Sequence, residues 1–148
     1  MRMTSHTDYA LRILIYLGTQ PERTATVSDI AGAYGLSHSH LLKVALRLRR
    51  LGYIGTTRGR AGGLRLAMAP EAINVGALMR TTEDEFALVE CLQARGNACV
   101  ITPACRLKGM LSEALDAYLA VLDRYTLADI LHNRAALAPL LGIADQAA

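Results

Sequence analysis

Apolar positions in the first twenty residues recur at helical spacing. Between Thr4 and Thr19 they fall three or four residues apart, with apolar neighbours that widen the same face. The residues concerned are Tyr9, Leu11, Ile13, Leu14, Ile15 and Leu17. Ser5 and Asp8 stand three apart, a spacing typical of the capping box that begins a helix. The pattern predicts an amphipathic helix over residues 4–19.

Two further helices are predicted after a short loop. Thr26 and Asp29 again stand three apart and indicate the start of a helix that ends at Gly35, a residue suited to the left-handed turn after a helix. Ser37 is the expected N-cap of the next helix, which ends at Gly52. Two helices joined by a short turn that contains glycine form a helix-turn-helix, whose second helix enters the major groove of DNA.

A short β-hairpin is predicted directly after these helices. Residues 53–57 favour a strand, residues 58–63 form a glycine-rich basic turn, and residues 64–68 alternate as a second strand would. A basic hairpin in this position is typical of a wing.

The second half of the chain predicts a long helix after an irregular segment. Pro70 breaks the chain, and Asn74 is the expected cap of a helix over residues 75–82. Thr102 as N-cap and Pro103 as first helical residue are expected to begin the long helix. Its apolar positions follow a heptad pattern, typical of helices that pair with one another. They are Leu107, Leu111, Ala114, Tyr118, Val121 and Tyr125.

The predicted fold class is therefore mainly α. It is a winged helix-turn-helix with a small β-hairpin wing and a long C-terminal dimerisation helix. The expected division is a DNA-binding domain over 1–82, a cysteine-containing loop over 83–105, the long helix and a short final helix over 103–135, and a tail over 136–148.

Composition and charge narrow the class of protein. The 148 residues are 52% hydrophobic and 20% charged, which is enough for a packed core. No apolar run approaches the length of a membrane span, and no signal peptide is indicated, so a cytoplasmic protein without a membrane partner is expected. No nucleophile–base pair, carboxylate pair or cofactor loop indicates an enzyme. Residues 37–65 contain seven basic and no acidic side chains, which favours a polyanionic partner.

The residues expected to contact double-stranded DNA lie at the start of the second helix of the helix-turn-helix and at the wing. They are Ser37, His38, Ser39, His40, Lys43, Arg47, Arg58 and Arg60. Ser and His can hydrogen-bond bases or phosphates, and wing arginines suit a narrow minor groove. The alternative for isolated basic residues is a solvated surface. The predicted pair of helices, the predicted hairpin and the absence of acidic residues from this segment all favour DNA binding.

Three cysteines fall within one irregular segment. Cys91, Cys99 and Cys105 are separated by seven and five residues. Three thiolates suit zinc or an iron–sulfur cluster, and since the usual number of ligands is four, one ligand is missing from the motif. Cys105 is expected in the first turn of the long helix, whose N-terminal dipole favours an anionic site. The alternative is three unrelated buried thiols.

Four stretches of the chain resemble a known family. They read TDYALRILIYL, VSDIAGAYGLSHSHLLKVALRLRRLGYI, RGRAGGLRLA and CVITPACRLKGMLSEALDAYLAVLDRYTLADIL. Together they resemble the NsrR-type nitric-oxide-sensing repressors of the winged-helix iron–sulfur regulator family that also includes IscR. The resemblance covers nearly the whole chain and weakens after about residue 135.

This resemblance implies a homodimeric repressor that binds a palindromic operator and responds to nitric oxide. It implies an iron–sulfur cluster on Cys91, Cys99 and Cys105, with a 4Fe-4S form favoured over a 2Fe-2S form. The fourth metal ligand that it implies is Asp8 of the partner subunit. From the residues alone, Asp8 is equally well explained as a carboxylate favoured by the helix dipole.

Two other interpretations remain. One is a regulator of the same fold that senses iron–sulfur or redox status. The other is a zinc-stabilised winged-helix module that binds protein.

Overall fold

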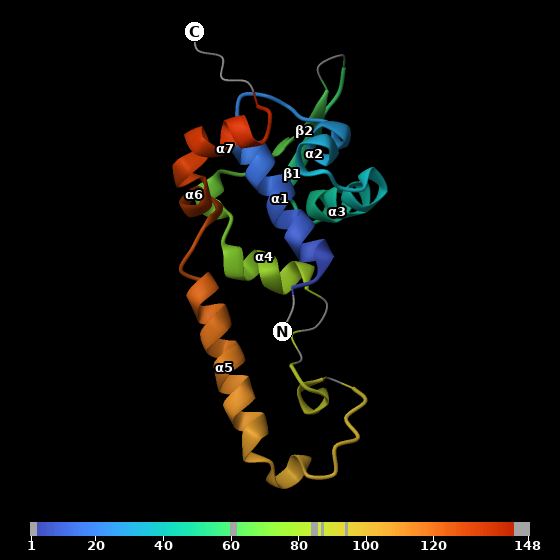
Figure 1. Ribbon diagram of the computed structural model, residues 1–148, viewed down its shortest axis with the longest axis vertical. Coiled ribbons are helices and arrows are strands. Elements are labelled where there is room, and N and C mark those ends of the chain that lie inside the picture. The colour runs from blue at the N-terminus through green and yellow to red at the C-terminus, as the bar shows by residue number, and fades with distance from the viewer. Residues whose placement is uncertain (1–2, 60–61, 84–85, 87, 94, 144–148) are drawn as a thin grey trace.

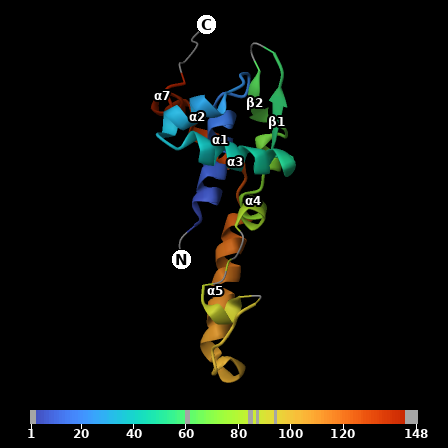
Figure 2. The same cartoon turned by 90° about the vertical axis from the view of Figure 1, so that its right-hand side faces the viewer.

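The computed structural model describes residues 3–59, 62–83, 86, 88–93 and 95–143. Its helices and strands are, in chain order, α1 (Ser5–Thr19), α2 (Val27–Tyr34), α3 (His38–Arg50), β1 (Ile54–Thr57), β2 (Gly63–Leu66), α4 (Val75–Thr82), α5 (Arg106–Leu122), α6 (Leu127–Ile130) and α7 (Arg134–Leu140). A head contains all of these elements except α5, which projects from the head as a stalk (Figure 1). Figure 2 shows the same separation after a quarter turn. The predicted fold class, a mainly helical winged helix with a long helix in its C-terminal half, is confirmed.

The centre of the head is α1. Its buried face carries Ala10, Ile13, Leu14 and Leu17 at the predicted helical spacing. The helix packs against α3, α4, α6 and α7. The predicted capping box of Ser5 and Asp8 was wrong. Thr4 is the N-cap instead, because its backbone is extended and its hydroxyl accepts the Thr7 N–H at 3.3 Å.

The helix-turn-helix is confirmed in α2 and α3. Thr26 and Asp29 form the predicted reciprocal capping box, and Gly35 ends α2 in the left-handed conformation at φ 63°. Ser37 is the N-cap of α3, although its hydroxyl lies 3.0 Å from that of Ser39 and makes no capping bond. The inner face of α3 is buried in the head through Leu41, Val44, Ala45 and Leu48.

The predicted wing is confirmed as an antiparallel pair of strands. Ile54 of β1 lies opposite Leu66 of β2, and Thr57 lies opposite Gly63. Leu64 also exchanges two backbone hydrogen bonds with Ala25, at 2.8 and 3.0 Å, which joins the hairpin to the loop before α2. A Cβ on Gly63 would lie 2.9 Å from the Ala25 carbonyl oxygen, so this close approach favours glycine.

The long helix begins later than predicted. Residues Thr102–Ala104 form a separate 3₁₀ turn, and Pro103 belongs to this turn rather than to the first turn of α5. Cys105 is the N-cap of α5, with ψ 108°, so the prediction that placed it in the first helical turn was wrong. The extended backbone at Cys105 prevents the turn and the helix from joining.

The end of α5 is fixed to the head through α4. The Nη1 and Nη2 atoms of Arg80 donate to the Asp123 carboxylate, at 2.5 and 2.7 Å, and these hydrogen bonds lower the pKa of Asp123. Asn74 caps α4, as predicted, and its amide donates to the Asp123 backbone carbonyl at 2.7 Å. Gly76 leaves room for the Asp123 carboxylate, because a Cβ at this position would collide with it.

After α5 the chain returns to the head. The predicted short helix after Thr126 is α6, and α7 is an additional helix that the sequence pattern did not predict. Leu127, Leu131 and Leu141 are buried against the same core as α1. The core of the head therefore contains residues from both sides of residue 82. Within the described part of the chain, each helix is too short or too polar to cross a membrane.

Candidate DNA-binding surface and metal-binding cysteines

The predicted DNA-contacting residues of α3 lie at its exposed N-terminal end. Ser37, His38, Ser39, His40 and Lys43 are all exposed. Because the opposite face of α3 is buried in the head, these side chains occupy the surface that a helix-turn-helix presents to the major groove. The arrangement positions hydrogen-bonding and cationic groups for bases and phosphates.

The wing lies beside this surface. In Figure 1 the hairpin and α3 occupy the same side of the head, and the Tyr53 N–H donates to the Leu48 carbonyl between them at 3.0 Å. Arg58 is exposed at the end of the hairpin. Arg60 lies outside the described residues, so its role stays a prediction.

Arg47 has a different environment from the other predicted contacts. Its Nη2 donates to the backbone carbonyl of Thr81, at the end of α4, at 2.7 Å. This hydrogen bond connects the recognition helix α3 to α4. It gives Arg47 a role within the fold, and contact with DNA remains a prediction for this residue.

A small pocket separates the start of α1 from α3. Its volume is about 210 Å³, and it is lined by Ser5, His6, Tyr9, His40, Lys43 and Val44. The lining combines two imidazoles, an ammonium group and two hydroxyls, all of which can bind an anion. The pocket therefore continues the cationic surface of α3 towards the first turn of α1.

The three cysteines occupy the segment between α4 and α5. Cys91 lies in a 3₁₀ turn over Glu90–Leu92, Cys99 precedes a second such turn, and Cys105 is the N-cap of α5. All three thiols are half-buried and free of disulfide bonds. Three soft sulfur donors fit an iron–sulfur cluster or zinc by their chemistry. Among the described residues, however, no three His, Cys, Asp or Glu side chains are gathered closely enough to hold a metal ion.

The backbone around Cys99 is held by two residues that the sequence analysis did not identify. The Asn97 carboxamide accepts the Cys99 N–H at 3.1 Å, and the Thr102 hydroxyl donates to the Cys99 carbonyl at 2.8 Å. The Asn97 amide also donates to the Thr102 hydroxyl at 3.1 Å. These bonds fix the turn between Cys99 and Cys105 independently of any metal.

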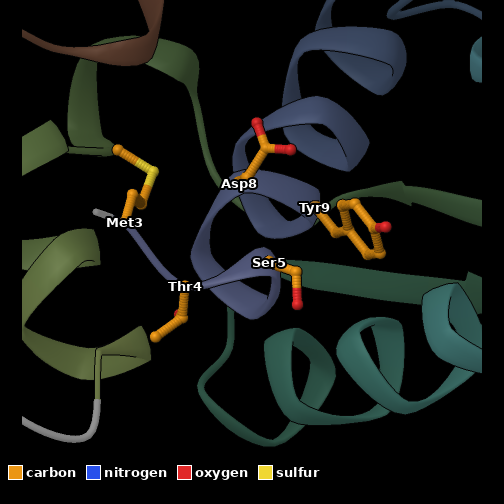
Figure 3. A pocket seen from close by; sticks show the side chains of 5 residues that line it. All are labelled: Met3, Thr4, Ser5, Asp8 and Tyr9. Atoms are coloured by element: carbon orange, nitrogen blue, oxygen red, sulfur yellow. The ribbon is translucent and has the colours of Figure 1, made fainter.

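Asp8 lies on the first turns of α1, next to an open pocket of about 640 Å³ (Figure 3). Met3, Thr4, Ser5 and Tyr9 line the same pocket. The Asp8 carboxylate pairs with Arg12 one turn further along, with contacts of 3.0 and 3.1 Å. The Asp8 side chain is 40% exposed, so one face of the carboxylate remains accessible.

The first turn of α1 is also bound to the end of α4. The buried Glu83 carboxylate accepts the Thr4 N–H at 2.8 Å. The buried Thr7 hydroxyl donates to the Thr82 hydroxyl at 3.0 Å. We call these two bonds the α1–α4 polar contact. It joins the turn that carries Asp8 to the point where the cysteine segment begins, and no local sequence pattern could indicate it.

The sequence is similar to those of known transcriptional regulators. Residues 3–133 match the family described as "Rrf2: Iron-dependent Transcriptional regulator". A Bacillus subtilis (strain 168) protein named HTH-type transcriptional regulator NsrR is 51% identical over 142 residues, which are 95% of this chain and 97% of that protein. Such names confirm the prediction of a transcriptional regulator rather than an enzyme.

Solved structures share the fold. The structure of CymR, the global cysteine regulator of B. subtilis, has a TM-score of 0.73 and 28% identity, covering 90% of this chain and 98% of that chain. The structure of T. potens IscR has a TM-score of 0.70 and 25% identity, covering 90% of this chain and 88% of that chain. From the family match over nearly its whole length, the sequence identity and the fold, the chain belongs to the Rrf2 family of transcriptional regulators.

Proposed function

We propose that this protein is a transcriptional repressor whose affinity for its operator is controlled by an iron–sulfur cluster that reacts with nitric oxide. The observation that carries the proposal is the placement of three disulfide-free cysteines in the segment between α4 and α5 of a winged-helix protein. The NsrR name of a relative with 51% identity supports it, as does the family's description as iron-dependent.

DNA binding is assigned to α3 and the wing of a homodimer. Two recognition helices about 34 Å apart would face successive major grooves of a palindromic operator. The stalk α5 supports the homodimer, because its 17 residues include none that is buried. Leu107, Met110 and Val121 are 57%, 59% and 42% exposed, and a second α5 would cover them.

Cys91, Cys99 and Cys105 are the proposed cluster ligands in each subunit. Asp8 of the partner subunit is the proposed fourth ligand, and a 4Fe-4S form is favoured over a 2Fe-2S form. When bound, the cluster supplies iron that reacts with nitric oxide. Since the three thiols are not gathered in the described residues, cluster assembly must draw this segment together.

Asp8 has two competing partners in this proposal. In the isolated chain its carboxylate pairs with Arg12, and ligation across the dimer would compete with this pair. The same turn of α1 is bound to Thr82 and Glu83. Because α1 packs against α3, a shift of this turn changes the position of the recognition helix.

The test is to purify the protein without oxygen, record its absorbance spectrum, analyse iron, sulfide and zinc, and titrate nitric oxide while measuring DNA binding. We expect a coloured protein that contains iron and sulfide and releases DNA on nitric oxide addition. Cys99→Ala should remove the iron while circular dichroism stays helical, since the core of the head does not contain this residue. Asp8→Ala with an unchanged cluster and response would contradict the proposed fourth ligand.

The other interpretations are outcomes of the same test. A colourless protein with stoichiometric zinc would assign the cysteines to a structural site and overturn the nitric oxide response. A coloured protein whose DNA affinity changes with oxidation or cluster occupancy, but not with nitric oxide, would indicate a regulator of iron–sulfur or redox status.

A further inference from the structure

The recognition helix exposes two leucines that the fold does not use. Leu42 and Leu46 are 43% and 42% exposed on α3, although leucine is among the residues most often buried. They are one helical turn apart and therefore neighbours on one side of the helix. The core-facing side of α3 is already occupied by other residues, Leu41, Val44, Ala45 and Leu48.

Polar and cationic side chains surround the two leucines. Ser39, Lys43, Arg49 and Arg50 are exposed on the same solvent-facing half of α3. Residues 37–65 contain no acidic side chain. A surface that is cationic with two apolar groups at its centre complements a partner that is anionic at its edges and carries apolar groups between them.

The major groove of DNA has this chemistry. Phosphates line both edges, and each thymine presents a C5-methyl group on the floor of the groove. Neighbouring side chains one helical turn apart are about 6 Å from each other, and base pairs stack about 3.4 Å apart. Leu42 and Leu46 therefore have a spacing that suits thymine methyl groups one or two base-pair steps apart.

We propose that Leu42 and Leu46 recognise thymine methyl groups, so that each half of the operator carries A·T base pairs where these leucines meet the groove. The inference rests on the proposed DNA binding by α3 and adds which bases this helix selects. Ser39 and the cations beside the leucines position the helix on the backbone, and the leucines discriminate thymine from bases without this methyl group.

The test replaces thymine by deoxyuridine, which removes only the methyl group. Protein purified without oxygen selects duplexes from a random-sequence library, and the best duplex is synthesised with thymine or deoxyuridine in its half-sites. Burial of one methyl group is worth about a fourfold change in affinity. The wild-type protein should therefore bind the deoxyuridine duplex about fourfold more weakly for each contacted methyl group, measured by fluorescence anisotropy.

Leucine variants identify the groups that sense the methyl. Leu42→Ala and Leu46→Ala should each bind the thymine duplex more weakly and show a smaller preference for thymine over deoxyuridine. Leu140→Ala is the matched control, because Leu140 is 80% exposed on α7 and should leave both affinities unchanged. Circular dichroism establishes that each variant is folded, which is expected because the replaced side chains are exposed.

Three results would overturn the inference. If the wild-type protein binds the thymine and deoxyuridine duplexes equally well, the proposed contact with the methyl groups is excluded, although DNA binding itself is supported. If both leucine variants still prefer thymine to deoxyuridine, other residues recognise the methyl group. If both variants bind DNA as tightly as the wild-type protein, Leu42 and Leu46 do not contact DNA. Failure to select any duplex would reject the proposed DNA binding together with the inference.

Discussion

At the scale of single residues, buried polar side chains connect the first turn of α1 with the end of α4. Thr7, Thr82 and Glu83 are among the few polar residues in the core. Each is satisfied by a partner about 75 positions away, so hydrogen bonds between the first turn of α1 and the end of α4 add to the packing of these helices. Loss of one partner leaves a buried polar group unpaired.

Glu83→Ala should lower the free energy of unfolding by about 0.5–1.5 kcal/mol, because the Thr4 N–H loses the acceptor that holds the first turn of α1 to the end of α4. Glu83→Gln retains an oxygen that can accept this bond and should be less destabilising. Chemical denaturation of the apo protein measures both. Glu22→Ala is the control at an exposed glutamate. Equal stability of Glu83→Ala and Glu22→Ala would show that this contact does not stabilise the head.

At the scale of elements, the junction between α4 and α5 depends on the absence of a side chain. Gly76 lies on α4 where the Asp123 carboxylate approaches to meet Arg80. The junction between α4 and the end of α5 therefore combines the Arg80–Asp123 ion pair, the Asn74 cap and the space left at Gly76.

Gly76→Ala should be less stabilising than a helical Gly→Ala change in open space, because the added methyl group displaces the exposed Asp123 carboxylate from Arg80. The matched control is Gly32→Ala in α2, where a Cβ meets no atom within 4 Å. That substitution should be stabilising by about 0.5–1 kcal/mol, since alanine favours a helix over glycine. Thermal or denaturant unfolding measures the stability of both variants. Equal changes in the free energy of unfolding for the two substitutions would contradict a steric role for Gly76.

The wing is the second element with a testable role. Arg58→Ala should weaken binding to a selected DNA duplex and reduce the slope of log affinity against log salt by about one, if its guanidinium neutralises a phosphate. Arg134→Ala in α7 is the control, since this arginine is exposed on another part of the head. Salt titrations by fluorescence anisotropy distinguish the two. An unchanged slope in Arg58→Ala would exclude the wing arginine from the interface.

At the scale of the whole molecule, the apolar surface of α5 determines the expected assembly. Met110→Glu should prevent dimerisation, because a carboxylate would replace an apolar group that is 59% exposed in the single chain. Analytical sedimentation measures the mass of the protein in solution, which should fall from that of a dimer to that of a monomer. The affinity of the variant for a palindromic duplex should be lower than that of the wild-type protein. Leu140→Glu, at a more exposed leucine on α7, should leave the mass unchanged. A dimeric Met110→Glu protein would place the interface elsewhere.

The sequence predicted the elements whose signals are local. Helix caps at Thr26 and Asn74, the glycine at residue 35 and the alternation in the hairpin all depend on neighbours a few residues apart, and the structure contains each of them. The start of α5 was misplaced because Thr102 and Pro103 also suit a 3₁₀ turn, and only the extended backbone at Cys105 distinguishes the two.

The features that sequence could not predict depend on distant residues. Nothing near Arg47 indicates that its guanidinium meets the Thr81 carbonyl, and nothing near Glu83 indicates Thr4. The cysteines were found as a cluster in sequence, but among the described residues they are not gathered into a metal site. The turn after Cys99 is held by Asn97 and Thr102, which no sequence motif indicated. Pattern alone therefore identified the candidate ligands and not their arrangement.

The return of α6 and α7 to the head has a consequence for biosynthesis. Leu127, Leu131 and Leu141 complete the core around α1, and the space beside Gly18 is filled by Leu131. A nascent chain emerges from the ribosome N-terminal end first. The DNA-reading helices are thus synthesised early, yet their core closes only after the cysteine segment has emerged. A ribosome-bound chain that stops before residue 127 should therefore remain sensitive to protease, and the head cannot complete its core before the cysteine segment has been synthesised.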